Sequence, residues 1–554
     1  MRGATAMAGR TQAYDYVIVG AGSAGCVMAN RLSEDPGTSV LLVESGPWDR
    51  SILIRMPAAV ALVKDSPRLN WRFETEPEPH LDGRRDIYHR GHVIGGSSSI
   101  NGMVYIRGNP LDFEGWARST GFAEWSYRHC LPYFKKSETR EKGGNAYRGD
   151  RGPLRVGSAA ADHPLHQTFL QAGDEAGYGV TDDVNGARQE GFYRVDWTIS
   201  AGRRQSSARA YLHPVLGRPN LSVRANTRVL KINFDGARAT GLRLADGTAE
   251  AEVRATREVI LCGGAIGSPH LLLLSGIGPA AALDRHGIAV VADRPGVGAN
   301  LQDHGGVYVQ YMCTEPISLT RYMSPAARAY VGAQWLLTKS GMGASNHFET
   351  GAFIRSDTAN YGNLQFQFIP FGGSYHAMSD TRTHGFQAKI TVQRPESRGS
   401  VTLASADPRA RPRIVFNYLA TERDRREMRE GIRALRTVFA QRVFDRFRGE
   451  EMRPGPTQMS DAELDAYARR ETVTDFHASC TCRMGPESDP ASVVDRTGLV
   501  HGTTGLRVID ASIYPDVITG NLNASIMMTA EKVADVIRGR PALAPESPPG
   551  LAIG

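Results

Sequence analysis

The fold is decided by residues 14–44, which read YDYVIVGAGSAGCVMANRLSEDPGTSVLLVE and end at Glu44. The opening YDYVIV is a short β-branched run, typical of a buried parallel strand. The glycine-rich turn GAGSAG follows at once, and CVMANRL after it predicts a helix. The next apolar run, SVLLV, predicts a second strand that ends in the acid. A strand, glycine turn, helix, strand and acid in this order predict a dinucleotide-binding βαβ unit.

Each glycine of the turn has a mechanical reason. Gly20 permits the tight turn, Gly22 lets the backbone approach a pyrophosphate, and Gly25 lets helix and strand pack closely. The helix N-terminus at Ser23 and Ala24 offers free N–H groups and a positive dipole end to phosphates. The acid at the end of the second strand lies 19 positions after the last glycine, where it would accept hydrogen bonds from ribose hydroxyls.

Composition excludes several other classes of protein. The 554 residues are 41% hydrophobic and 22% charged, which predicts a folded chain of several domains. The net charge of +7 is spread along the chain and forms no basic patch, so we expect no nucleic-acid partner. Six cysteines are too few for a disulfide framework, and the C-x-C at 480–482 lacks zinc-site spacing, so no metal is expected. The first 12 residues lack a signal-peptide core, and no apolar run reaches 18 residues, which predicts a cytoplasmic protein without a transmembrane span.

Two further glycine clusters lie at residues 90–102, RGHVIGGSSSING, and 262–269, CGGAIGSP. In the first, GGSS offers unhindered backbone donors and hydroxyls to a phosphate or a ring system, and a flexible serine loop is the alternative. The second follows a predicted strand at 258–261 and precedes an apolar helix at 270–274, so an ordinary turn between strand and helix is the alternative.

The middle of the chain lacks dinucleotide motifs. Residues 348–354, 364–369, 386–392 and 400–403 predict strands of one mixed or antiparallel sheet. Residues 423–439 predict an amphipathic helix. These elements indicate a second domain that is interleaved with the dinucleotide-binding one.

Together these pieces resemble the glucose–methanol–choline (GMC) family of flavin oxidoreductases over residues 14–540. Beyond the glycine clusters, the resemblance rests on NLQDH at 300–304, HASCTCRMG at 477–485 and DASIYPDVITGNLN at 510–523. Within the family, INGMVYIRGN at 100–109 is most similar to the bacterial choline dehydrogenases.

The resemblance implies FAD as the cofactor and an α/β fold, in which a Rossmann-like FAD-binding domain is interleaved with an α+β substrate-binding domain built on a mixed or antiparallel sheet. The expected boundaries are 14–155, 215–306 and 488–540 for the FAD-binding domain, 156–214 and 307–487 for the substrate-binding domain, and 1–13 and 541–554 for flexible tails. The residues expected to hold the cofactor are Gly20, Gly22, Ser23, Ala24, Gly25, Glu44, Gly95, Gly96, Ser97, Asn101, Gly102, Val104, Val229, Ala265, Asp510 and Ala511.

The resemblance also implies a catalytic pair. His477 stands where the family has its active-site histidine, and Asn521 stands 44 positions later where the family has the partner of that histidine. The chemistry agrees, because alcohol oxidation removes a hydroxyl proton and a hydride, and a neutral histidine is a suitable base. For Asn521 a helix-capping role is the alternative. His304, His347 and His384 are expected to be structural hydrogen-bonding residues.

Two positions depart from the family pattern. Ile100 stands where some members carry a histidine bonded covalently to the flavin, so we expect non-covalent FAD. The dipeptide 305–306, Gly-Gly, includes the place where choline-specific members carry a glutamate that faces the trimethylammonium group. The substrate pocket is expected to include Phe476, Glu349 and Gly306, with Trp71 and Tyr375 as further aromatic candidates.

The implied activity is FAD-dependent oxidation of a primary alcohol to the aldehyde, by proton abstraction at His477 and hydride transfer to flavin N5. Choline and other aliphatic or aryl alcohols remain alternative substrates, and a quinone, another carrier or oxygen remain alternative electron acceptors. A flavin-binding protein without turnover is the alternative of another class, which the presence of both His477 and Asn521 opposes. The sequence leaves peripheral attachment to the inner membrane face open.

Overall fold

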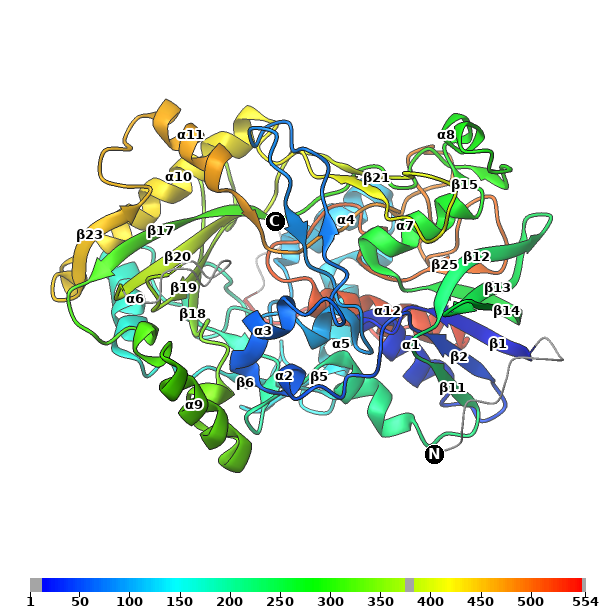
Figure 1. Ribbon diagram of the computed structural model, residues 1–554, viewed down its shortest axis with the longest axis horizontal. Helices are drawn as coiled ribbons and strands as arrows, with labels where there is room; N and C mark the ends of the chain where they lie inside the picture. The colour runs from blue at the N-terminus through cyan, green and yellow to red at the C-terminus, as the bar shows by residue number, and fades with distance from the viewer. Residues whose placement is uncertain (1–11, 374–382, 551–554) are drawn as a thin grey trace.

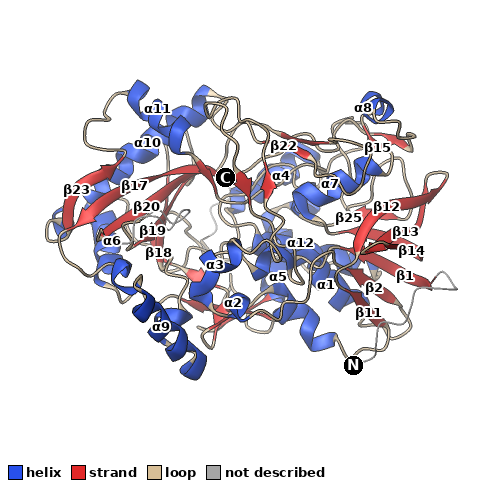
Figure 2. Cartoon of the chain, viewed as in Figure 1, coloured by secondary structure: helices blue, strands red, loops and turns tan. Residues whose placement is uncertain are grey.

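The computed structural model describes residues 12–373 and 383–550. Most of its strands belong to two sheets of seven strands each, which lie at two ends of the molecule (Figure 1). Between these ends, helix α12 packs against both α1 and α5 (Figure 2). The helices are α1 Ser23–Leu32, α2 Ile52–Arg55, α3 Val60–Lys64, α4 Pro110–Thr120, α5 Tyr127–Ser137, α6 Pro164–Glu175, α7 Gly264–Leu274, α8 Ala280–Arg285, α9 Pro325–Thr338, α10 Glu422–Phe439, α11 Asp461–Glu471 and α12 Asn523–Ile537.

The first sheet has the order β11-β2-β1-β14-β13-β12, and β25 pairs with β14. Its strands are β1 Gln12–Val19, β2 Val40–Val43, β11 Leu221–Arg224, β12 Arg228–Asp235, β13 Arg238–Asp246, β14 Ala249–Leu261 and β25 Leu506–Val508. The pairs that join β11, β2, β1, β14 and β25 are parallel, and β12, β13 and β14 pair antiparallel. The predicted βαβ unit is confirmed as β1, α1 and β2, and apolar runs such as VLLV of β2 are buried on both faces.

The second sheet is antiparallel throughout, in the order β23-β17-β20-β19-β18-β7, and β24 pairs with β17. Its strands are β7 Gly191–Arg194, β17 Gly305–Cys313, β18 Thr350–Ile354, β19 Leu364–Ile369, β20 Gly385–Val392, β23 Arg448–Arg453 and β24 Val473–Thr474. The α/β fold with a second, antiparallel sheet agrees with the prediction.

The central strands of the second sheet alternate between apolar and polar residues. The apolar positions of VYVQY (307–311), LQFQF (364–368) and FQAKI (386–390) join a core with α10. The polar positions point to the opposite face, as strand geometry requires, and most of them are buried too, while Tyr308 and Gln367 are half-buried. The sheet therefore turns a buried polar face away from α10.

One predicted strand belongs elsewhere. Residues 400–403 were expected in the second sheet, but β21 Ser400–Thr402 pairs with β22 Arg413–Val415 in a separate two-stranded sheet. The reason is that the backbone N–H of Val401 donates to the carbonyl of Gly298, which ties the segment to a loop beside α7.

The two sheets draw on the segments expected for the two domains. The strands of the first sheet all come from residues 12–43, 221–261 and 506–508, and those of the second from 191–194 and 305–474. The domain boundaries themselves stay a prediction. No helix in the described part of the chain is both long and apolar enough to cross a bilayer.

The C-terminal segment differs from the expectation of a flexible tail over residues 541–550. The N–H of Leu543 donates to the Tyr133 hydroxyl at 3.1 Å, and the N–H of Glu546 donates to the carbonyl of Arg128 at 2.8 Å. The hydroxyl of Tyr147 donates to the carbonyl of Pro549 at 2.7 Å. Arg128 and Tyr133 belong to α5, so the first two of these contacts hold the segment along that helix.

Candidate active site

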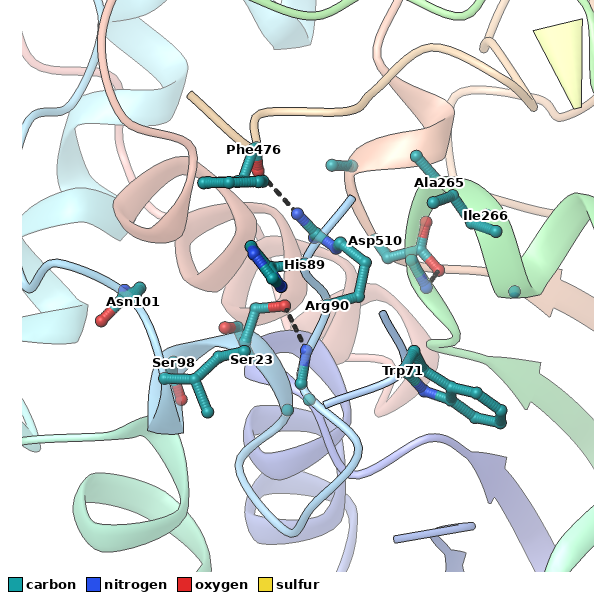
Figure 3. A pocket seen from close by; sticks show the side chains of 18 of the residues that line it. Ser23, Trp71, His89, Arg90, Ser98, Asn101, Ala265, Ile266, Phe476 and Asp510 are labelled. Atoms are coloured by element: carbon teal, nitrogen blue, oxygen red, sulfur yellow. Dashed lines mark hydrogen bonds between the residues drawn. The ribbon is translucent and has the colours of Figure 1, made fainter. Parts of the chain in front are cut away.

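A large cavity lies between the two sheets and extends from the glycine turn after β1 to His477. Figure 3 shows part of its lining, with Ser23, Asn101, Asp510 and Phe476 among the labelled residues. Most of the predicted residues line it, namely Gly20, Gly22, Ser23, Ala24, Glu44, Gly96, Ser97, Asn101, Gly102, Val104, Val229, Ala265, Phe476, His477, Asp510, Ala511 and Asn521. The cavity therefore brings together residues that lie up to about 500 positions apart in the chain.

The glycine turn has the geometry that its sequence predicts. Gly20 has φ +95°, and a Cβ on it would lie 2.6 Å from the carbonyl oxygen of Cys262. A Cβ on Gly25 would lie 1.9 Å from the carbonyl oxygen of Gly20, so the first helical turn packs directly on the strand end. Gly25 therefore acts in packing and does not line the cavity. Gly95, with φ +90°, is likewise a turn residue behind the lining.

Gly22 is different, because a Cβ there would meet only the oxygen of Cys262, at 3.9 Å. The open space faces the cavity, and Gly96 of the second glycine cluster stands against the Cα of Gly22, where a Cβ would lie 2.7 Å away. No side chain in the described ranges caps the N-terminus of α1, so its N–H groups are available to an anion. These features fit the pyrophosphate of a flavin dinucleotide.

Glu44 supports the turn from below. Its Oε2 accepts a hydrogen bond from the N–H of Ala21 at 2.8 Å, and its Oε1 accepts one from the N–H of Gly46 at 2.8 Å. Burial raises the pKa of the carboxyl group, and the two backbone donors oppose that shift. Both oxygens of the carboxylate thus accept hydrogen bonds from the backbone. The expected contact of Glu44 with a ribose stays a prediction.

Asp510 and Asn101 are positioned by hydrogen bonds on opposite walls (Figure 3). The carboxylate of Asp510 accepts from the N–H of Gly264 at 2.8 Å and from the Ser268 hydroxyl at 2.6 Å. The amide oxygen of Asn101 accepts from the guanidinium of Arg204 at 2.7 Å. That Asp510 and the Asn101 loop hold the ribityl and ring portions of FAD, as the resemblance implies, stays a prediction.

His477 and Asn521 meet at the other end of the cavity. The Nδ2 of Asn521 lies 3.2 Å from the Nε2 of His477. The Nδ1 of His477 lies 2.9 Å from the Nδ1 of His304, and the Nε2 of His304 lies 3.0 Å from the carbonyl oxygen of Gln393. The backbone N–H of His477 donates to Asp303 at 2.6 Å.

These contacts fix the tautomers of both histidines. A carbonyl can only accept, so the Nε2 of His304 carries its proton and the Nδ1 of His304 is the acceptor. His477 therefore donates from Nδ1, and its unprotonated Nε2 accepts from the Nδ2 of Asn521. His304 is a hydrogen-bonding residue, as expected, and its partner is His477.

Burial keeps this pair neutral. Burial, with the neighbouring His304 as a smaller cause, lowers the pKa of His477 to about 3. Burial also lowers the pKa of His304 to about 4. His477 is thus unprotonated at neutral pH, the form that accepts a proton.

Asn521 is held in place by a buried carboxylate, that of Asp112. Its Oδ2 accepts from the backbone N–H and the hydroxyl of Thr519, both at 2.8 Å, and from the N–H of Asn109 at 2.8 Å. Its Oδ1 accepts from the hydroxyl of Tyr361 at 3.0 Å. The same side chain therefore closes the capping box of α4 and fixes the loop that carries Asn521.

The cavity also has side chains that the sequence reasoning missed, among them His89, Arg90, Tyr308, Gln367 and Lys389. Arg90 donates to the carbonyl oxygen of Phe476 at 2.6 Å (Figure 3). Tyr308, Lys389 and Gln367 belong to the polar face of the second sheet and occupy one row across β17, β20 and β19. The alternation of polar and apolar residues in those strands is the signal that could have found this row.

Two expected pocket residues are not brought to the cavity. The carboxylate of Glu349 accepts from the Ser345 hydroxyl at 2.6 Å and from the N–H of Ala161 at 3.0 Å, outside the lining. Gly306 lies inside β17, where a Cβ would lie 2.0 Å from the carbonyl oxygen of Ile390. Tyr375 lies outside the described residues.

Comparisons with known proteins agree with this architecture. The model of the GMC oxidoreductase family matches residues 14–305 and, in its C-terminal part, residues 395–530. An oxygen-dependent choline dehydrogenase of Ectopseudomonas mendocina is 49% identical over 548 residues, 98% of this chain and 97% of the relative. The crystal structure of pyridoxine 4-oxidase from Mesorbium loti has a TM-score of 0.86 at 32% identity, covering 95% of this chain and 100% of the other. A variant of Aspergillus oryzae formate oxidase, studied for FAD modification, has a TM-score of 0.89 at 27% identity, covering 96% and 99%.

Proposed function

The chain belongs to the GMC oxidoreductase family. On that premise we propose that a primary alcohol is oxidised to the aldehyde in the cavity between the sheets, with His477 and Asn521 as the residues that act on its hydroxyl group. The family and the curated relatives make the chain an FAD-dependent alcohol oxidoreductase. The proposal concerns the residues that act and the alcohol that they act on.

The observation that carries the proposal is the tautomer of His477. Its Nε2 faces the cavity without a proton, because Nδ1 donates to His304. A hydroxyl that enters the cavity can therefore give its proton to Nε2. The proton then resides on an imidazolium whose Nδ1–H keeps its acceptor.

Asn521 orients the same hydroxyl. Its Nδ2 donates toward the Nε2 of His477, and its Oδ1 is buried with no hydrogen-bond partner among the described residues. A buried amide oxygen without a donor is costly, so a site of this kind favours a ligand that brings one. The Oδ1 of Asn521 suits a donor group of the ligand, and its Nδ2 is suited to donate to the alkoxide once Nε2 has taken the proton.

Bound FAD supplies the hydride acceptor. The residues that would hold it are those of the Gly20 turn, the N-terminus of α1, the second glycine cluster and Asp510. Gly22 leaves room for the pyrophosphate, and Asp510 and Asn101 stand on opposite walls. The non-covalent attachment expected from Ile100 is part of the proposal.

The test is His477→Ala in the holoenzyme, with anaerobic flavin reduction by an alcohol panel as the readout. We expect kcat to fall by roughly two to four orders of magnitude, the usual contribution of a general base, while the flavin spectrum stays intact. His80→Ala, at an exposed histidine, is the matched control and should keep the activity of the unmodified chain. Unchanged turnover in His477→Ala would remove His477 from the mechanism.

We also propose oxygen as the electron acceptor, because the curated relatives are named oxygen-dependent. Measurement of hydrogen peroxide against reduction of a dye acceptor tests this. The quinone alternative, the cytoplasmic location and peripheral attachment to a membrane stay predictions.

A further inference from the structure

Lys389 stands in the middle of the polar row on the floor of the cavity. Its cross-strand neighbours are Tyr308 on β17 and Gln367 on β19, and all three line the cavity together with His477. The side chain of Lys389 is only 4% exposed. A buried ammonium group beside the catalytic histidine makes the charge of this end of the cavity the decisive property.

The only acid beside Lys389 in the described lining is already paired with it. The ammonium donates to Asp475 Oδ1 and to the carbonyl oxygen of Thr474, the latter at 2.9 Å. The other oxygen of Asp475 accepts from the hydroxyl of Thr391 at 2.9 Å. Burial opposes the charge on Asp475, but the ammonium outweighs it, so the pKa of this carboxyl group is lowered and the pair is ionic.

The remaining acids of the described lining are Glu44 and Asp510, at the cofactor end. Both use their oxygens for backbone and hydroxyl donors of the glycine clusters. Glu349 lies outside the lining, and Gly306 has no side chain to offer. Within the described part of the lining, no carboxylate is therefore free to face a cation beside His477.

One aromatic ring of the lining already faces a cation. A quaternary ammonium is bound by aromatic faces and opposite charge. The ring of Trp71 already has the guanidinium of Arg228 over it, at 5.5 Å from its centre. Five basic residues line the cavity, namely Lys64, Arg90, Arg228, Lys389 and Arg411.

From these contacts we infer that the substrate is a primary alcohol without a positive charge, whose remaining part presents a hydrogen-bond acceptor or an apolar group to Lys389 and Gln367. The inference rests on the proposed function and narrows its substrate. An ammonium group has three N–H donors, and Asp475 and Thr474 accept two of them, so the third suits an acceptor atom of the substrate. Choline, the cation in the name of the relatives, is disfavoured by the same groups.

The experiment compares two alcohols of nearly equal shape. Choline and 3,3-dimethylbutan-1-ol differ by a quaternary nitrogen in place of a quaternary carbon. We expect the neutral isostere to reduce the flavin of the anaerobic holoenzyme with a kcat/KM at least tenfold higher than that of choline. A kcat/KM for choline equal to or above that of the isostere overturns the inference.

A charge variant gives a second, independent readout. Gln367→Glu keeps the shape of the side chain and places a carboxylate opposite Lys389, so the choline-to-isostere ratio of kcat/KM should rise at least tenfold. Gln367→Met is the matched neutral control, and its ratio should stay within a few fold of that of the unmodified chain. An equal ratio in both variants, each with full flavin content, contradicts the inference.

The outcomes separate the inference from the proposed function. Reduction of the flavin by choline in preference to the neutral isostere overturns the inference and leaves alcohol oxidation at His477 standing. If neither these two alcohols nor hexan-1-ol and benzyl alcohol reduce the flavin, the proposed function fails, and the inference fails with it.

Discussion

Replacement of His304 by leucine tests how His477, the proposed base, is held in its reactive tautomer. His304 is fully buried, 173 positions before His477, and accepts the Nδ1–H of His477 at 2.9 Å. Leucine fills a similar volume but accepts nothing, so the Nδ1–H of His477 would be left buried without an acceptor. The proton could then move to Nε2, where it blocks the transfer from the alcohol.

The magnitude follows from the kind of hydrogen bond that is lost. Once His477 has taken the proton, its Nδ1–H belongs to a cation, and hydrogen bonds of charged groups contribute about 1.5–3 kcal/mol. Since about 1.4 kcal/mol corresponds to a factor of ten in rate, His304→Leu should lower the rate of flavin reduction about 10- to 150-fold.

The assay is anaerobic stopped-flow reduction of the flavin at saturating alcohol. His304→Asn is the matched control, because its amide oxygen offers an acceptor near the position of the imidazole Nδ1 while the bond to the carbonyl of Gln393 is lost in both variants. We expect the asparagine variant to stay within about fivefold of the unmodified chain. Equal rates for the two variants, with unchanged flavin spectra, would refute the reasoning.

Three further predictions concern the cofactor and stability. Acid precipitation should release all the flavin, because Ile100 cannot form a covalent bond to it; flavin absorbance in the pellet would contradict this. Gly22→Val should abolish FAD binding yet preserve the circular dichroism of the apoprotein, since a Cβ there would enter open cavity, whereas Gly25→Ala should lower the melting temperature through its clash with Gly20; flavin retained by Gly22→Val would be the opposing result. The free energy of unfolding should fall as pH drops below 6.5, because His304 and His477, with pKa lowered to about 4 and about 3, stay neutral in the fold while the unfolded chain binds protons. Between pH 7.5 and 5.0 each contributes roughly 2 kcal/mol, so urea unfolding of His304→Asn should show a pH dependence smaller by about that amount.

The part of the site that could be predicted from the sequence is the part made by short segments. The positions of Gly20, Gly22 and Gly25 follow from a turn between a strand and a helix, and turn geometry depends on neighbouring residues. His477 and Asn521 were predicted by resemblance, and the cavity has them in contact.

The part that could not be predicted depends on strand register. Lys389 faces the cavity because it lies opposite Tyr308 and Gln367, and a shift of one residue in β20 would turn it toward α10. Gly306 was expected in the pocket, but β17 places it between neighbouring strands, where only a glycine fits beside the carbonyl of Ile390. The pairing of strands from distant parts of the chain decides both positions.

The carboxylate of Asp112 has a consequence for how the enzyme comes into being. It accepts hydrogen bonds from the start of α4, from Thr519 and from Tyr361, which belong to three distant stretches of the chain. Since these three stretches together fix the loop that carries Asn521, we expect the pair with His477 to be ordered only once all three have met. We therefore expect that a newly made chain that has bound FAD but has not closed around Asp112 does not oxidise alcohols. Its His477 has no ordered partner until folding is complete.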